Sequence, residues 1–589
     1  VVVNTQSEVS PEMEIMAADD IGIGVELFPS LSPLTFSLYD SFLTSHCSSC
    51  FSLLSPTSPA SLYCSAACSL FNSPTVSQIP PDNSPILSSD IRAALRLLNS
   101  ISFSAVVTAS LPHRLGGLLT NHHRLMADSS FSIAIQRAAC FIAAVLKSDR
   151  ENTELEEATI CCVLTNAVEV QDSTGLALGI ALYDSRFSWI NHSCSPNACY
   201  RFVISPPNSI TTTSYHDSPK IIPRIINTEK EQISVCSITS LWEGKTVGYG
   251  PKVITRSIKK IKSGEEITIS YIDLLQPTGL RQSDLWSKYR FMCNCGRCAA
   301  SPLAYVDSIL EGVLALEPQK TTAGHHHGAT NKDDAVRKMT DRIEEAIDDF
   351  LSDDINPETC CEKIESVLHH GIQIKADSSQ PNHHHLWLHP SHHVALNAYI
   401  TLAAAYRIRS TDSETDTRKA FDMSRISAAY SLFLACVSHH LVSAEPSLAI
   451  SAANFWKSAG ESLLDLARKF LMEEHDVKCS KCLMLVGTYN SRRDIKENLK
   501  QILRCVTDIS QVAWSFLTRG CSYLQKFKSP VEYSFTVTNC EKEESSEDQR
   551  GRSVLLLSFH CLLYADLLTY LCYGRKSYML SQSHSVISD

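Results

Sequence analysis

The stretch NHSCSPNACYRF at residues 191–202 decides how the rest of the chain is interpreted. Asn191 and His192 stand directly before Cys194, and Pro196 stiffens the turn that follows. Two strong side-chain hydrogen-bonders, a thiol and a turn-forming Ser-Pro-Asn are thus packed together. A loop with a purely structural role rarely needs all of them. The stretch therefore indicates a functional site whose other parts lie elsewhere in the chain.

Length and composition bound the class of protein. The chain has 589 residues, 44% of them hydrophobic and 20% charged, so roughly two to four globular domains are expected. The net charge of −11 argues against a general nucleic-acid binder, and no direct nucleic-acid binding is expected. No signal peptide and no run of about 18 apolar residues is apparent, so no membrane span is expected. With 23 cysteines, such an intracellular chain more often holds metal than disulfides.

The spacing of apolar residues divides the chain into regions. Helical spacing predicts helices over 91–165, and short β-rich runs broken by turns predict a compact β region over 166–275. Helical spacing returns from residue 301 and continues to 589. A disordered N-terminus is expected at 1–16 and a Pro/Ser-rich linker at 71–90. The expected class is therefore α+β, with an all-α C-terminal domain.

A first group of cysteines has the spacing of metal ligands. Cys47-x-x-Cys50 is followed, after thirteen residues, by Cys64-x-x-x-Cys68. Two such pairs suit one tetrahedral zinc. The alternative is four unrelated buried thiols. Zinc is favoured because so short a segment has little core of its own, and the bound ion can supply folding free energy.

A second group lies in FMCNCGRC, with thiols at Cys293, Cys295 and Cys298. Three thiolates are one ligand short of a closed structural zinc site. Cys194 is the obvious fourth ligand, although it lies about a hundred residues upstream. A zinc at this place would fix the Asn-His pair beside Cys194 in a defined direction. Two zinc ions are therefore expected in the whole chain.

NHSCSPN, GEEITISYID at 264–273 and YRFMCNCGRC at 289–298 together resemble the SET-domain protein methyltransferases. The order of parts is similar to that of the SET-and-MYND branch, and a plant SET-domain-group member is the nearest match. This resemblance implies a SET domain split by a small zinc finger and a helical insert, then a tetratricopeptide-like helical domain. The implied segments are the N-terminal part of SET at 17–46, a partial MYND-type finger at 47–70, the helical SET insert at 91–165, the SET core at 166–275, the post-SET motif at 276–300 and the helical domain at 301–589.

The resemblance also implies roles for single residues, with S-adenosylmethionine as cofactor. The matching positions are Asn191 and His192 as the pair that holds the cofactor, Tyr271 beside the transferred methyl group, Phe291 on the adenine, Tyr289 at the lysine channel, Asn121 as a further cofactor contact, and Cys194, Cys293, Cys295 and Cys298 as post-SET zinc ligands. The implied activity is methyl transfer to a lysine of a histone or another protein. Such an in-line displacement needs alignment of nitrogen, methyl and sulfur far more than acid–base groups.

Three features depart from the family pattern. Ile21 and Ile23 stand where the family has polar or basic cofactor contacts, which indicates either an apolar strand start or a degraded cofactor loop. Val168 replaces a ring of the lysine channel. The finger retains four of the eight ligands of a full MYND finger. Two alternatives therefore stay open: a weak or inactive SET scaffold that binds partners through its helical domain, and a repeat adaptor with a vestigial SET region. The expected compartment is the nucleus, the cytoplasm or both.

Overall fold

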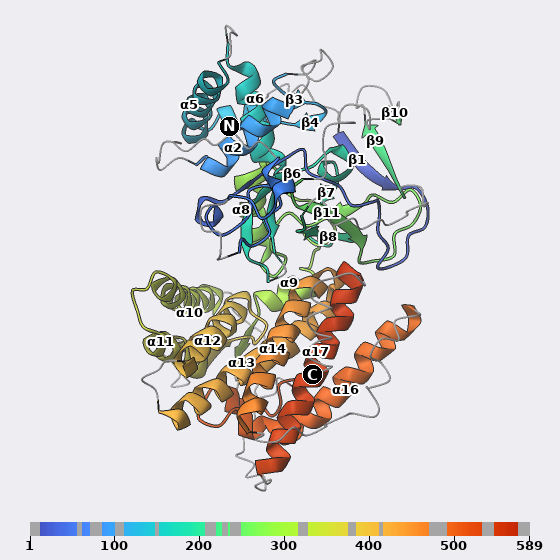
Figure 1. Cartoon of the computed structure of the whole chain (residues 1–589). Coiled ribbons are helices and arrows are strands. Elements are labelled where there is room, and N and C mark those ends of the chain that lie inside the picture. Colours follow the sequence, from blue (N-terminus) through green and yellow to red (C-terminus); the bar gives the residue numbers. More distant parts are fainter. Residues whose placement is uncertain are drawn as a thin grey trace. The chain divides into compact units, whose positions relative to one another are not determined.

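The computed structural model describes residues 12–55, 62–70, 85–100, 111–147, 152–172, 174–206, 220–226, 234–235, 249–315, 328–374, 384–411, 416–470, 492–532 and 547–574. The chain forms two compact units (Figure 1). The N-terminal unit comprises Val1–Ile272 and Leu280–Cys295, and the helical unit comprises Asp273–Gly279 and Gly296–Asp589. The prediction of an α+β chain with a helical C-terminal half is confirmed. The C-terminal half is not all-α, however, because three short strands within residues 313–388 supply one another's backbone hydrogen-bond partners and form a small antiparallel sheet.

Small sheets form the framework of the N-terminal unit. Their strands are β1 (Glu12–Ala17), β9 (Ile221–Ile226) and β10 (Ser234–Val235) in one sheet, β2 (Thr35–Leu38), β6 (Ala177–Leu182) and β5 (Val168–Gln171) in a second, and the pairs β8 (Ala198–Val203) with β11 (Lys252–Ser257), β3 (Arg114–Leu115) with β4 (Leu118–Leu119) and β7 (Asn191–His192) with β12 (Thr268–Ile269). In β11 every second residue is buried, so one face of this strand packs on the core.

Strand β1 corrects the prediction of a disordered N-terminus through residue 16. Residues 12–17 pair in antiparallel register with β9. The alternation in EMEIMA directs Ile15 and Ala17 into the core, where they are 0% and 1% exposed. This burial and the hydrogen bonds to β9 keep the segment ordered, although its composition alone is polar.

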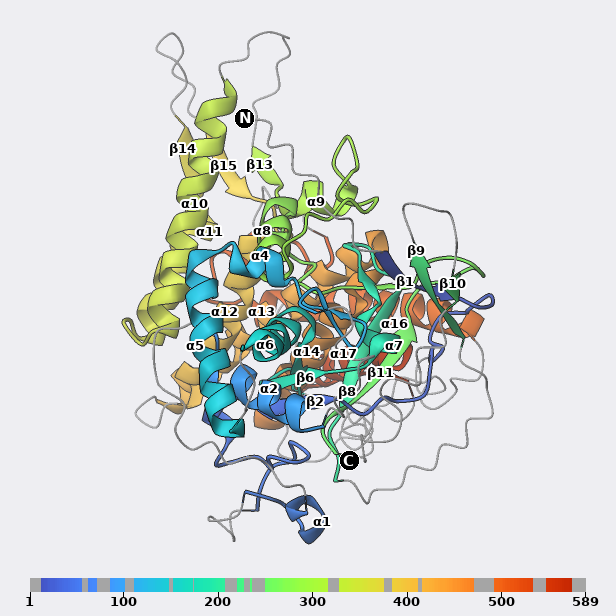
Figure 2. The ribbon, with the colours of Figure 1, turned by 90° about the horizontal axis from the view of Figure 1, so that it is seen from above.

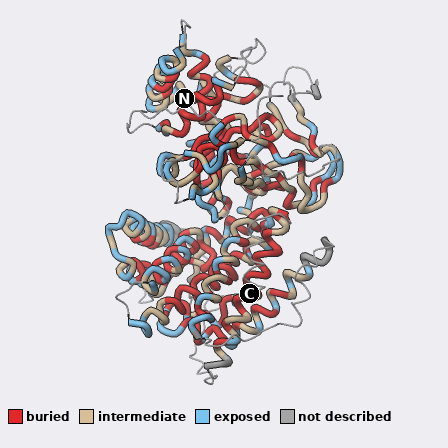
Figure 3. The backbone as a smooth tube through the Cα atoms, in the orientation of Figure 1, coloured by how far each residue is buried: buried red, intermediate tan, exposed pale blue. Residues whose placement is uncertain are grey.

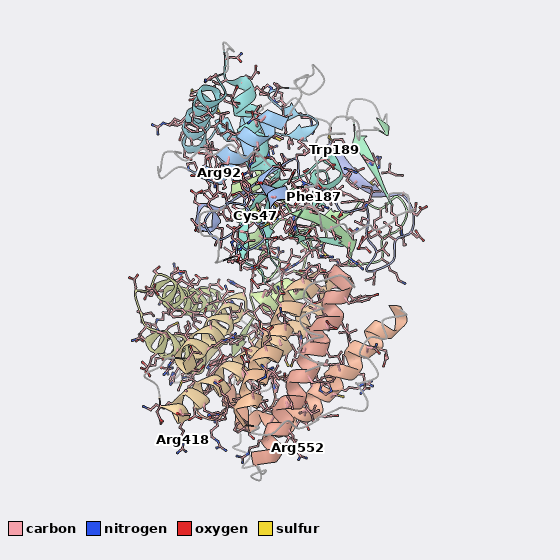
Figure 4. All side chains as sticks on the ribbon, viewed as in Figure 1. Cys47, Arg92, Phe187, Trp189, Arg418 and Arg552 are labelled. Atoms are coloured by element: carbon pink, nitrogen blue, oxygen red, sulfur yellow. The ribbon has the colours of Figure 1, made fainter. Side chains whose placement is uncertain are left out.

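Helix α2 (Ser88–Ser100) packs on strands β2 and β6 of the second sheet. The other helices of this unit include the short α1 (Ala66–Ser69), α4 (His122–Met126), α5 (Ser129–Leu146) and α6 (Glu154–Asn166), and α2, α5 and α6 pack on one another (Figure 2). Helix α2 begins at Ser88, slightly before the predicted end of the linker, and residues 71–84 of that linker lie outside the described part. Arg92 of α2, labelled in Figure 4, donates to the Leu38 carbonyl of β2 at 2.8 Å and to Asp40 at 2.6 Å. The helix thereby satisfies polar groups at the end of the strand.

The helical unit buries the inner faces of long helices and exposes their outer faces (Figure 3). Its elements are α9 (Tyr305–Leu310), α10 (Gly328–Leu351), α11 (Pro357–His370), α12 (His393–Thr411), α13 (Thr417–Ala444), α14 (Ala449–Phe470), α16 (Arg492–Leu517), α17 (Glu547–Tyr573) and a sheet of β13 (Val313–Ala315), β15 (His384–Leu388) and β14 (Ile372–Ile374). Helices α14 and α17 approach closely at Gly460, whose carbonyl accepts a 2.9 Å hydrogen bond from Ser558. Small residues at helical spacing make this approach possible.

Three described helices are long and apolar enough to cross a membrane, judged by length and composition only. They lie at Ser129–Leu146, Thr417–Ala444 and Arg550–Tyr573. The expectation that no such stretch exists is therefore wrong. In the second and third helices 78% and 72% of the apolar window is buried, because these are core helices of the helical unit. In the first, 28% of the window is buried.

Candidate functional site

Two segments far apart in sequence meet at the candidate site. Strand β7 carries Asn191 and His192 and pairs in parallel with Thr268 and Ile269 of β12. The side chain of Asn197, at the end of NHSCSPN, holds these two paired segments together. Its Nδ2 donates to the Glu266 carbonyl at 2.8 Å, and its Oδ1 accepts from the Thr268 amide at 2.9 Å. The Ser-Pro-Asn turn therefore has a structural role: it holds the two segments in register.

Four rings gather where these segments meet. The centroid of Tyr271 lies 5.4 Å from His192, 4.8 Å from Tyr289 and 6.5 Å from Phe291. His192 and Phe291 are 6.1 Å apart. The structure thus brings together four of the positions singled out in the sequence. Their specific roles stay predictions.

Hydrogen bonds fix the orientation of Tyr271. Its hydroxyl donates to the Ile190 carbonyl at 2.5 Å, and its backbone amide donates to Nδ1 of His192 at 3.1 Å. Burial raises the pKa of Tyr271 well above its usual range, so the phenol keeps its proton. Burial lowers the pKa of His192 to about 4. A neutral imidazole that accepts at Nδ1 carries its proton on Nε2, the atom 3.3 Å from Sγ of Cys194.

The side-chain amide of Asn191 is held by two acceptors. Nδ2 donates to the Met13 carbonyl at 3.1 Å and to Oε1 of Glu266 at 2.8 Å. With both hydrogens used, the amide oxygen of this exposed residue is the group that a ligand can reach. Glu266 escaped the sequence analysis, although it lies within the quoted GEEITISYID. Its side chain was not distinguishable there from an ordinary exposed carboxylate.

Asn121 lies at the edge of the same site. It precedes α4 with a left-handed φ of 52°, and its Nδ2 donates to the Tyr289 carbonyl at 3.3 Å. The described contact of this amide is thus with the turn that carries Tyr289. The predicted contact with a cofactor stays a prediction.

The apolar Gly-x-Gly loop turns at Gly24. Gly24 has a φ of 72°, which favours glycine. The Ser257 hydroxyl donates to the Gly22 carbonyl and accepts from the Val25 amide at 3.0 Å. Ile21 is 3% exposed and exchanges backbone hydrogen bonds with Ile261, so its side chain belongs to the core.

The first cysteine group forms a compact cluster. The sulfurs of Cys47, Cys50, Cys64 and Cys68 all lie within 4.8 Å of one another. Those of Cys50 and Cys64 are 3.5 Å apart, and those of Cys64 and Cys68 are 3.7 Å apart. A zinc–sulfur distance of about 2.3 Å implies sulfur separations of about 3.8 Å in a tetrahedron. The donor set and its spacing therefore fit one zinc ion, in this case outside the main hydrophobic core.

The second cysteine group joins distant parts of the sequence. The sulfurs of Cys194, Cys293, Cys295 and Cys298 also lie within 4.8 Å of one another. Gln282 of α8 (Thr278–Tyr289) supports the site, because its side-chain amide bonds the Cys293 carbonyl at 2.7 Å and the Cys293 amide at 2.8 Å. Among the described residues, these are the two groups of three or more possible metal ligands. Two clusters consistent with two zinc sites are thus present, as expected.

Comparison with known proteins identifies the family. The SET domain matches residues 141–272, which include Asn191, His192 and Tyr271. The Arabidopsis thaliana protein named "Protein SET DOMAIN GROUP 41" is 69% identical over 579 residues, which cover 97% of this chain and 100% of that protein. The chain belongs to the SET-domain proteins. The recognition made from the sequence is confirmed.

More distant relatives resemble parts of this SET-domain chain. "Histone-lysine N-methyltransferase SMYD3" of Mus musculus is 27% identical over 136 residues, 23% of this chain and 21% of that protein. "N-lysine methyltransferase SMYD2" of Homo sapiens is 49% identical over 43 residues, 7% of this chain and 10% of that protein. The chain thus aligns with about a fifth or less of these two relatives, and their similarity covers less than a quarter of it.

Proposed function

We propose that this SET-domain protein is an S-adenosylmethionine-dependent protein-lysine N-methyltransferase. The observation that carries the proposal is the ring cluster around Tyr271 at the β7–β12 crossing, with a phenol hydrogen-bonded to the Ile190 carbonyl. The names of the distant relatives SMYD2 and SMYD3 give the same class of reaction for those proteins. The substrate would be a lysine of a histone or of another protein.

The residues of the site suit this chemistry. S-adenosylmethionine, when bound, supplies a methyl group on a positively charged sulfur. The oxygen of Asn191 accepts a hydrogen bond from the amino group of such a ligand, and Phe291 packs on its base. Tyr289 walls the channel for the lysine side chain. The Tyr271 hydroxyl oxygen and the Ile190 carbonyl would accept hydrogen bonds from a neutral lysine amine and so direct its lone pair at the methyl group. The methyl group would then pass from sulfur to nitrogen, the sulfur would keep the electron pair of the broken bond, and the methylated amine would release its extra proton to water.

The two zinc ions have a structural role in this proposal. Closed Cys₄ sites contribute folding free energy and leave no position open for a substrate. Cys194 follows His192 of β7 by two residues. A zinc ion at the second site would therefore hold β7 beside the 293–298 segment. The helical unit, which we propose to be tetratricopeptide-like, would bind protein partners. The compartment would be the nucleus, the cytoplasm or both.

The test is cofactor binding followed by methyl transfer. Calorimetric titration with S-adenosylmethionine should give saturable binding, and a radiolabelled methyl group should appear on a protein in mixed histones or cell lysate. Tyr271→Phe should lower the labelling rate by about a hundredfold, in the range seen when one oriented hydrogen-bonding group is removed from an active site. The matched control is Tyr305→Phe, because the Tyr305 ring is 66% exposed on α9. An unchanged rate in Tyr271→Phe would remove this residue from the mechanism.

A scaffold without activity is the second candidate. The observation that favours it is the side chain of Val168, which lies in β5 opposite Ala181 and leaves the predicted channel without one ring. Ile23 adds to it, because no polar group stands at that loop position. In this case the protein would bind S-adenosylmethionine weakly or not at all, and no labelled product would form. Binding without transfer would also support the scaffold.

A further inference from the structure

The turn Tyr289–Arg290–Phe291 carries two of the four rings in the site. It follows the end of α8 at Tyr289. Arg290 has a left-handed φ of 61°, a conformation that is strained for a residue other than glycine. Such strain persists where the surrounding structure holds the backbone on several sides. The question is which groups hold this turn.

Two side chains of the helical insert bind the carbonyl groups of the turn. Asn121 Nδ2 donates to the Tyr289 carbonyl at 3.3 Å. One helical turn later, Arg124 Nη1 donates to the Arg290 carbonyl at 2.9 Å. Both donors come from the segment at the start of α4, more than 160 residues before the turn. The backbone on either side of the strained residue is thus fixed by one short helix.

The side chain of Arg290 returns to the same insert. Its Nη2 lies 3.1 Å from Oδ2 of Asp128, and its guanidinium lies 5.2 Å from the ring centroid of Phe131. The pair is partly shielded, with side-chain exposures of 13% for Arg290 and 34% for Asp128. The other carboxylate oxygen of Asp128 accepts from the Ser130 amide at 3.1 Å and caps α5. One carboxylate therefore starts α5 and holds the turn at the same time.

We propose that Asn121, Arg124, Asp128 and Phe131, hereafter the insert clamp, are positioning residues that set the Tyr289 and Phe291 rings. The inference rests on the proposed function, since these rings are assigned to the lysine channel and to the cofactor. The clamp residues themselves act through the turn. Loss of the clamp releases the strained Arg290 backbone, so the adjoining rings lose their fixed positions. The affinity for the cofactor then falls, and the KM for the protein substrate rises.

Three variants separate the parts of the clamp. Asp128→Asn removes the charge that pairs with Arg290 but keeps an oxygen to cap α5. Arg290→Gln removes the other partner, and Arg124→Met removes the bond to the Arg290 carbonyl while keeping an unbranched stem. The matched control is Lys147→Gln. Lys147 is an exposed cation at the C-cap of α5 and has a similar left-handed φ of 50°, but it lies at the other end of the helix.

The first readout needs no activity. Hydrogen exchange of the backbone amides of residues 289–292 should become faster in Arg124→Met and in Asp128→Asn, and should stay at the wild-type rate in Lys147→Gln. Equal exchange rates in the wild type, Arg124→Met, Asp128→Asn and Lys147→Gln would overturn the proposal of an insert clamp. If the wild-type protein binds no S-adenosylmethionine, the proposed function fails, and this exchange experiment still decides the clamp.

The second readout is the binding of S-adenosylmethionine by calorimetry. Asp128→Asn and Arg290→Gln should each raise Kd about threefold to fivefold, because a partly exposed ion pair makes only a modest contribution to the position of the turn. The double variant should show the effect of one single variant, because both remove the same pair. KM for the protein substrate should rise while the melting temperature changes by no more than in Lys147→Gln. The inference would be overturned if the increase in Kd of the double variant equalled the product of the increases in the two single variants. It would also be overturned if Kd and KM were equal to wild type in both single variants.

Discussion

Arg297, inside the CNCGRC motif, forms a buried ion pair with Asp307 of α9. Its Nε lies 3.1 Å from both carboxylate oxygens, and its Nη2 lies 2.6 Å from Oδ1. The side chains are 2% and 0% exposed. Nη2 also donates to the Leu274 carbonyl at 3.1 Å. The substitution Asp307→Asn would remove the carboxylate that compensates the charge of this buried guanidinium.

The expected cost follows from this geometry. Removing one partner of a buried pair destabilises a protein by about 3–5 kcal/mol, because the remaining charge stays desolvated. The helical unit that contains both residues has about 300 residues. At about 2.1 cal/mol/K per residue, its unfolding entropy is roughly 0.6 kcal/mol/K. The melting temperature of this unit should therefore fall by about 5–8 °C.

Differential scanning calorimetry measures the shift. The control is Asp334→Asn, which breaks the exposed pair of Asp334 with Arg337, whose side chains are 41% and 71% exposed, and should lower the midpoint by less than about 1 °C. The double variant Arg297→Met/Asp307→Leu should recover most of the loss, since no charge stays buried. Zinc content should stay at two ions in all variants. A shift in Asp307→Asn no larger than that in Asp334→Asn would refute the reasoning.

The remaining predictions concern the metal, the packing and the pH dependence. Cys194→Ser should lower the zinc content from two ions to one, measured by plasma mass spectrometry; full occupancy would show that another ligand completes the site. Gly460→Ala should destabilise the helical unit by about 1–3 kcal/mol, because a Cβ there would lie 2.6 Å from Cγ of Leu562; an unchanged melting temperature would contradict this packing. Burial lowers the pKa of His392 to about 3, so the stability that its neutral form contributes is lost as pH falls from about 6.5 toward 3, by about 2 kcal/mol at pH 5 for this group. His392→Asn keeps an acceptor for the Val394 amide, so its melting temperature should fall less between pH 7 and pH 5; an equal fall would assign the effect to other groups.

The metal clusters were predictable because ligand chemistry constrains sequence spacing. Cys47 and Cys50 can share an ion only if their thiols lie on one tight loop, and the same holds for Cys293, Cys295 and Cys298. The fourth ligand of the second site followed from the requirement for four donors. That requirement pointed to Cys194 without any knowledge of the path of the chain, and the structure brings its sulfur within 4.8 Å of the others.

Other parts of the site depend on contacts that no local pattern encodes. Asn191 bonds Glu266 across 75 positions, and Arg124 bonds Arg290 across 166. Periodicity shows which face of a helix is apolar, but it does not show which distant carbonyl an exposed arginine will meet. Strand β1 was missed for a related reason. Its few alternating residues become a strand only when β9 supplies hydrogen-bond partners.

The position of Ile21 changes the weight of the two proposed functions. From the sequence, Ile21 and Ile23 indicated either an apolar strand start or lost cofactor contacts. In the structure Ile21 is 3% exposed in the core and exchanges backbone hydrogen bonds with Ile261, while the φ of 72° at Gly24 keeps the turn. Ile21 thus has a packing role that accounts for its apolar side chain, and it no longer argues for an inactive scaffold. The case against catalysis then depends on Ile23 and Val168. In the proposed mechanism, a loss at these two positions would weaken binding of the reactants, whereas the phenol of Tyr271, which we propose to orient the amine, keeps its hydrogen bond to the Ile190 carbonyl. This position of Ile21 therefore adds support to the proposed enzyme, with reduced affinity, over the scaffold.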